Sequence, residues 1–103
     1  MASSKLVQLL VPLIKDSPNN TSLHEKTKQE LLRHFGGVTR YNRAPVEGLW
    51  KNAQSVVERD NLIVYEVMVP KLKKKWWRRY SARLAKRFRQ KAISICAQRI
   101  DII

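Results

Sequence analysis

The chain has 103 residues, of which 44% are apolar and 28% charged, and its formal net charge is +13. This length fits one domain with a single hydrophobic core, and the apolar share argues against intrinsic disorder. The single cysteine excludes an internal disulfide and a thiolate zinc cluster. The apolar stretch 6–14 is too short to span a bilayer and is followed by no cleavage pattern. We therefore expect a soluble, cytoplasmic protein. We also expect no membrane binding, because the apolar side of the basic helix predicted over 71–90 is needed for the core.

The basic residues are concentrated in the last third of the chain. Residues 1–70 hold nine basic and seven acidic side chains, whereas residues 71–103 hold twelve basic side chains and one acid, Asp101. Such an asymmetry is typical of proteins with a polyanionic partner, which can be a nucleic acid, a membrane surface or an acidic protein.

The first predicted elements are a strand and a helix. Residues 5–14 are apolar almost without interruption, which indicates a strand buried on both faces. Ser22 and Glu25 have the spacing of a capping box that would begin a helix over 22–35, and the two glycines after it would end it. Residues Leu23, Thr27, Leu31 and Phe35 would face the core, with Glu25, Lys26, Gln29, Glu30 and Arg33 on the solvent side.

The second half of the chain predicts two further strands and a basic helix after an irregular segment. Within 38–59, "VTRY" and "GLWK" have strand character, and Pro45 places this segment at a sheet edge or bulge. A strand over 62–69, a helix over 71–90 and a last strand in 92–103 follow. The strand over 62–69 would present Ile63, Tyr65, Val67 and Val69 on one face and Leu62, Val64, Glu66 and Met68 on the other.

The element order β-α-β-β-α-β predicts one α+β domain over residues 1–103. The first and third strands are the most apolar on both faces, which suits the two central strands of a ferredoxin-like antiparallel sheet of order 4-1-3-2. Both helices would then cover one face of the four-stranded sheet. The other face would expose Leu62, Val64 and Met68, and this apolar surface predicts a homodimer formed sheet to sheet.

The stretches "GLWKN", "DNLIVYEVMV" and "YSARLAKRF" carry a resemblance to known proteins. In this layout they resemble the ferredoxin-like and dimeric α/β-barrel families, including small bacterial proteins of that fold. The resemblance spans most of the chain and implies a fold rather than an activity.

The sequence contains no recognisable catalytic or metal-binding signature. It has no Gly-rich phosphate loop, and His24 and His34 lie about 15 Å apart along one predicted helix, too far to share a metal. Each histidine is interpreted as a packing or solvent-facing residue, and Cys96 as an inert core cysteine in an apolar strand. We therefore expect no metal, no cofactor and no catalytic residue, with one candidate exception.

That exception is Glu66, which lies between Val64 and Met68 on one strand face. If a dimer partner closed a cavity over this face, the carboxylate could act as a general acid or base, with Tyr41 and Trp50 as candidate walls. In the alternative interpretation, Glu66 pairs with an arginine across the sheet or protrudes at an edge.

The predicted basic helix over 71–90 has two distinct sides. At about 100° per residue, the side chains of Trp76, Trp77, Tyr80, Leu84 and Phe88 fall within an arc of about 120°, which indicates a core-facing side. Arg87 falls inside this arc near the helix end, where we expect it to extend to solvent. Like charges without acidic partners destabilise a helix, so the opposite side is interpreted either as a surface for an anionic ligand or as a merely solvated face. The predicted polyanion-binding residues are Lys73, Lys74, Lys75, Arg78, Arg79, Arg83, Lys86 and Arg89.

Two functions are consistent with these features. The first is a non-catalytic homodimeric module whose basic helix contacts RNA or DNA phosphates with low sequence specificity, because no base-reading motif is present. The alternative is a dimeric α/β-barrel protein that holds a small ligand in a sheet-lined cavity, or an enzyme that uses Glu66.

Overall fold

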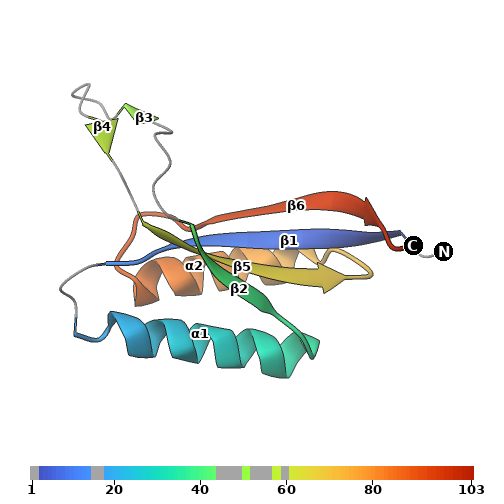
Figure 1. Cartoon of the computed structure of the whole chain (residues 1–103), viewed down its shortest axis with the longest axis horizontal. Helices are drawn as coiled ribbons and strands as arrows, with labels where there is room; N and C mark the ends of the chain where they lie inside the picture. Colours follow the sequence, from blue (N-terminus) through green and yellow to red (C-terminus); the bar gives the residue numbers. More distant parts are fainter. Residues whose placement is uncertain (1–2, 15–17, 44–49, 52–56, 59–60) are drawn as a thin grey trace.

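The computed structural model describes residues 3–14, 18–43, 50–51, 57–58 and 61–103. It is an α+β fold in which two helices cover one face of a four-stranded antiparallel sheet (Figure 1). The sheet consists of β1 (Ser3–Pro12), β2 (Thr39–Arg43), β5 (Leu62–Val69) and β6 (Ser94–Asp101), and the helices are α1 (Asn20–Phe35) and α2 (Lys74–Arg87). A separate two-stranded sheet pairs β3 (Trp50–Lys51) with β4 (Val57–Glu58).

The two strands with apolar residues on both faces, β1 and β5, lie at the centre of the sheet. The order is β2-β5-β1-β6, or 2-3-1-4 when these four strands are numbered along the chain from the β2 edge. Val7 of β1 pairs with Val67 of β5 on one side and with Ala97 of β6 on the other. The edge strands β2 and β6 are therefore the two strands with least apolar surface to bury.

The core lies between this sheet and the helix layer. Alternate side chains of β1 and β5 point toward the helices, as the period-two pattern of residues 62–69 predicted. On α1, the four-residue period places Thr27 and Leu31 in the core, with Leu23 and Phe35 packed against it. The inward-facing side chains of the two central strands are Val7, Leu9, Val11, Ile63, Tyr65, Val67 and Val69.

The start of α1 differs from the prediction, whereas its end agrees with it. The helix begins at Asn20, and the predicted Ser22 capping box is not formed, because the Ser22 hydroxyl donates to the Asn19 carbonyl oxygen at 2.9 Å. The side chain of Asn20 accepts a hydrogen bond from the amide of Ile14 at 3.1 Å, which ties the helix start to the end of β1. Gly36 ends the helix in the left-handed conformation at φ 80°, with its amide bonded to the Leu32 carbonyl.

The segment after α1 was predicted only in part. The "VTRY" piece forms the edge strand β2, but "GLWK" does not extend it, because Trp50–Lys51 pairs with Val57–Glu58 instead. Pro45 and the side chain of Trp50 lie outside the described residues.

The predicted helix over 71–90 is shorter in the structure. It begins at Lys74, after the non-helical Lys73, and ends at Arg87. Arg89 adopts the left-handed conformation at φ 53°, and the amide of Gln90 bonds to the carbonyl of Ala85 at 2.8 Å. This is the hydrogen bond of a Schellman-type helix end, so Arg89 lies beyond the helix.

A buried histidine connects α1 to the sheet. The Nε2 atom of His24 lies 3.0 Å from the carbonyl oxygen of Pro12, and its Nδ1 atom lies 2.6 Å from the Tyr65 hydroxyl. Burial lowers the pKa of His24, the charge of Arg40 acts in the same direction, and the bond to Pro12 opposes them. The neutral ring therefore donates from Nε2 to Pro12, and the Tyr65 hydroxyl donates to Nδ1 and to the His24 carbonyl oxygen, which lies 3.1 Å away. Burial also raises the pKa of Tyr65 to about 12, so that hydroxyl keeps its proton.

Protonation of His24 should destabilise the fold. The pKa of the ring is below 6.5 in the folded chain, so the unfolded chain binds more protons as the pH falls through that value. The free energy of unfolding should therefore be lower at about pH 5 than at about pH 6.5. Glu25 and Glu30 contribute little to this difference, because their pKa values are lowered and they take up protons only below about pH 4.5. Urea denaturation at both pH values should show a smaller decrease for His24→Gln than for the wild type. An equal decrease in both proteins would contradict this assignment.

Candidate functional site

One side of α2 is packed into the core. Trp77, Tyr80, Leu84 and Phe88 are buried, and Trp76 packs partly buried beside them. This confirms the core-facing arc predicted from the sequence. The aromatic rings of this side are therefore covered by protein and are not available as platforms for nucleic-acid bases.

The opposite side of α2 is basic and exposed. All eight residues predicted to bind a polyanion are solvent-exposed, although Lys73 precedes the helix and Arg89 follows it. Among the described residues, none of these eight side chains forms an ion pair with a carboxylate. The six that belong to the helix form three groups: Lys74 and Arg78 toward β6, Arg83 and Lys86 toward α1, and Lys75 and Arg79 between them.

Arg87 joins the two helices through an ion pair that the sequence did not indicate. Its guanidinium donates to both carboxylate oxygens of Glu30 at 2.8 Å and to the Thr27 hydroxyl at 3.0 Å. Tyr80 donates to the same carboxylate at 2.8 Å. Two predictions are therefore wrong: Arg87 does not extend to solvent, and Glu30 faces α2 because the neighbouring helix supplies three donors.

The electrostatics of this pair leave the helix layer positive. Burial disfavours the charged form of Glu30, but the hydrogen bonds from Arg87 and Tyr80 outweigh it and lower the pKa of the carboxyl. Hydrogen bonding to Glu30 likewise outweighs burial and raises the pKa of Arg87. The carboxylate is therefore ionised at neutral pH and is neutralised by a cation that is not part of the exposed set.

A groove of about 510 Å³ between the two helices adds one residue to the basic surface. It is lined by Glu30 and Arg87 at the ion pair and by the exposed cations Lys26, Arg83 and Lys86. Lys26 was predicted only as a solvent-facing residue of the first helix. Its place on α1 was readable from the helical period, but its position across from α2 depends on how the two helices pack.

The sheet face away from the helices carries a short hydrogen-bonded cluster centred on Glu66. The side-chain amide nitrogen Nε2 of Gln8 donates to Glu66 Oε2 at 2.6 Å, and the Tyr41 hydroxyl donates to the same oxygen at 3.4 Å. Glu66 therefore contacts a neutral partner on the neighbouring strand β1. Tyr41, predicted as a cavity wall, does lie beside it.

The three residues of the predicted dimer face differ in exposure. Met68 is 62% exposed and Leu62 is half-buried, but Val64 is only 1% exposed. The cross-strand neighbours of Val64 are Leu10 and Tyr41, and the chain itself buries it. Val64 is therefore covered within a single copy, although it does not belong to the core cluster between the sheet and the helices.

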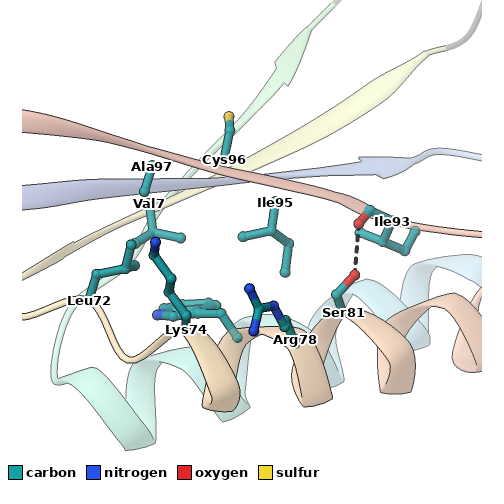
Figure 2. A pocket seen from close by; sticks show the side chains of 10 residues that line it. Val7, Leu72, Lys74, Arg78, Ser81, Ile93, Ile95, Cys96 and Ala97 are labelled. Carbon is teal, nitrogen blue, oxygen red and sulfur yellow. Dashed lines mark hydrogen bonds between the residues drawn. The ribbon is translucent and has the colours of Figure 1, made fainter.

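The prediction for Cys96 was wrong. Its side chain is exposed, because the residue belongs to the edge strand β6 and alternation turns it away from the helices. Figure 2 shows its sulfur on the face opposite to the neighbouring Ile95. The Sγ atom lies 3.9 Å from Oε1 of Gln8, the residue that also contacts Glu66.

The part of the chain that the structure describes meets neither the requirements of a metal site nor those of a membrane-spanning helix. No group of three potential ligands among histidine, cysteine, aspartate and glutamate is assembled there. Neither of its helices has the length and the apolar surface needed to cross a bilayer. In comparisons with known proteins, no family model matches the sequence and no curated protein matches it significantly. Function is therefore inferred from the geometry and charge of the helix layer.

Removing the Glu30 carboxylate should destabilise the protein. Glu30→Ala leaves the guanidinium of Arg87, whose side chain is 9% exposed, without its bidentate acceptor, at a cost of about 2 kcal/mol. Glu25→Ala is the matched control, because it removes exposed pairs with Lys28 and Arg40 that contribute less than about 1 kcal/mol. Chemical denaturation of both variants measures the difference. Equal losses of unfolding free energy would show that the Glu30 pair has no special role.

Proposed function

We propose that this protein is a non-catalytic module whose helix layer binds the phosphates of RNA or DNA with low sequence specificity. The observation that carries the proposal is the set of six exposed cations on α2, none of which is paired with a described acid. A helix held by its buried aromatic side presents these charges at fixed spacing. The exposed thiol of Cys96 supports a reducing, cytoplasmic location as part of the same proposal.

The dimensions of the basic surface support contact with several phosphates. From Lys74 to Lys86 the helix rises about 18 Å, and duplex DNA carries one charge per about 1.7 Å of its axis. Lys26 on α1 widens this surface across the groove between the helices. The helix sequence contains no asparagine or glutamine to recognise adenine, which supports backbone contact rather than base reading.

We also propose that the sheet and its helices belong to the ferredoxin-like folds. The first support is the strand order, because β2-β5-β1-β6 becomes 4-1-3-2 when the same sheet is counted from the β6 edge. The second is the placement of both helices on one face of the sheet. The small β3–β4 sheet would be an addition between the second and third strands of that fold.

A homodimer formed through the open sheet face is the third part of the proposal. Met68 is highly exposed there, beside its cross-strand neighbour Leu6. Half-buried leucines at 10 and 62 extend this apolar surface. A second copy would cover it. The alternative function, a ligand cavity containing Glu66, has less support, because no described groove is lined by that residue.

Binding to nucleic acid should be tolerant of sequence and steeply dependent on salt. If about five phosphates are neutralised, the logarithm of the association constant should fall with the logarithm of salt at a slope of about −4 to −5. With that slope, a fourfold rise in salt concentration would lower the association constant roughly several hundredfold. Fluorescence anisotropy with labelled duplexes of unrelated sequence measures both properties.

Charge reversal locates the contact. Arg79→Glu combined with Lys86→Glu should weaken binding strongly and flatten the salt slope, because both side chains project from the exposed side of α2. The control variant combines Lys91→Glu with Arg99→Glu, which changes the net charge equally but lies outside the helices. Equal weakening by both variants would assign the binding to net charge alone and would reject α2 as the contact surface.

The dimer prediction uses the exposed Met68 rather than the buried Val64. Met68→Glu should dissociate the dimer without unfolding the chain, because the side chain is largely exposed in a single copy. Sedimentation equilibrium at about 50 µM should give twice the mass of 12.1 kDa for the wild type and the single mass for the variant. Cys96 provides a second measurement, since a covered thiol reacts more slowly with a maleimide in the wild type than in Met68→Glu. A wild type that sediments as one copy would reject the interface.

A further inference from the structure

Strand β6 has an outer edge that no described strand occupies. It pairs with β1 on its inner side and is the last strand in the sheet order. Figure 1 shows β6 along the margin of the sheet over its full length, Ser94–Asp101. Alternate residues of such a strand direct their amide and carbonyl groups outward, where they can pair with an added strand.

A groove lies directly under this edge, between β6 and α2. It encloses about 410 Å³, and its apolar lining includes Val7, Trp77 and Ile95. Figure 2 shows the side chains of Lys74 and Arg78 rising from α2 toward β6 at the mouth of the groove. The edge of β6 therefore lies beside a surface that is apolar at its base and cationic at its rim.

We propose that this edge and groove together bind an extended peptide segment of a partner protein that carries acidic residues at alternate positions. The segment would add to β6 as a fifth strand, and its side chains on the helix side would enter the groove. This site shares Lys74 and Arg78 with the proposed nucleic-acid surface, but the groove and the edge of β6 are not part of that surface.

The spacing of the two cations fits alternate residues of a strand. Lys74 and Arg78 are one helical turn apart, a separation of about 6 Å, and alternate residues on one face of a strand are separated by about 6.8 Å. The hydrogen bond from the Ser81 hydroxyl to the Ile93 carbonyl, 2.8 Å long, holds α2 against the start of β6. Acidic side chains at positions i and i+2 of the added strand would therefore meet both cations, and an apolar side chain at the next position of the same face, i−2 or i+4, would cover Ile95.

Charge complementarity decides between an acidic peptide and a second copy of this chain. A second copy paired through β6 would bring its own Lys74 and Arg78 to the same interface, where the like charges of the two copies would repel each other. An acidic strand neutralises these cations instead. A nucleic acid would meet the two cations but would leave the outward amides of β6 unpaired, because it offers no strand to the edge.

The probe for this proposal is a synthetic peptide of about ten residues, long enough for a strand the length of β6. Glutamates stand at two alternate positions on one face, valines at the flanking positions of that face, and threonines on the other face. Nuclear magnetic resonance should show shifts in the amides of 94–101, together with slowed hydrogen exchange of the amides that face outward. A peptide methylated at its alternate backbone nitrogens should produce neither effect, because it cannot donate to the β6 edge.

Two double variants on the same helix separate this site from the rest of the basic surface. Lys74→Glu with Arg78→Glu should weaken peptide binding at least about tenfold, whereas Lys75→Glu with Arg79→Glu should leave it within about threefold. Both double variants change the net charge by the same amount. Lys74→Glu introduces its negative charge in the first turn of α2, where it favours the helix. The second variant should weaken nucleic-acid binding more than the first, so failure of one proposal can be recognised without the other.

The following results would overturn the inference. One is peptide binding that persists in the Lys74 and Arg78 variant, or that leaves the exchange of the β6 amides unchanged. Another is slowed exchange of these amides that depends on protein concentration alone, which would assign the edge to a second copy. A third is an RNA oligonucleotide that produces the same β6 protection and depends on the same two cations.

Discussion

Burial of the aromatic side of α2 is the constraint on which the other surfaces depend. Each of Trp77, Tyr80 and Phe88 contributes about 2–3 kcal/mol by leaving water, so a rotation of the helix about its axis would lose more than any surface contact could restore. The rotation in turn determines which cations face β6, which face solvent and which face α1. The basic surface is thus a consequence of core packing, which fixes the backbone positions from which its cations extend.

The ion pair between Glu30 and Arg87 follows from that same rotation. Arg87 falls on the flank of α2 that meets α1, where its stem is buried and its charge needs a partner. Glu30 provides it and is thereby removed as a counter-ion for the exposed cations. A protein with eight acids and twenty-one basic side chains has few carboxylates to place in this region, and Glu30, which faces α2, is held by Arg87.

Sequence periodicity was sufficient where a residue's position depended on local alternation alone. It identified the inward face of β5, the core side of α2 and the central position of the two most apolar strands. It did not identify Cys96 as exposed or Val64 as buried, because a period assigns a side chain to a face and does not say what covers that face. The start of α1 was missed for a related reason: the contact of Asn20 with Ile14 joins residues on either side of a loop, and a local capping pattern contains no information about it. Arg87 and Glu30 are separated by 57 residues, so only the packing of the helices brings them together.

The two proposed sites share one helix, and their charges are close enough to interact. Lys74 and Lys75 are adjacent in the chain, and the distance between groups on neighbouring sides of one helix is comparable with the screening length of about 8 Å at physiological salt. Two glutamates bound at the β6 edge would therefore lower the positive potential at Lys75 and Arg79 as well as at their direct partners. Acidic peptide and nucleic acid would then weaken each other's binding, by the same factor in both directions because the coupling free energy is shared. Such antagonism requires no change of conformation, since it follows from placing two anion sites on adjacent sides of one rigid helix.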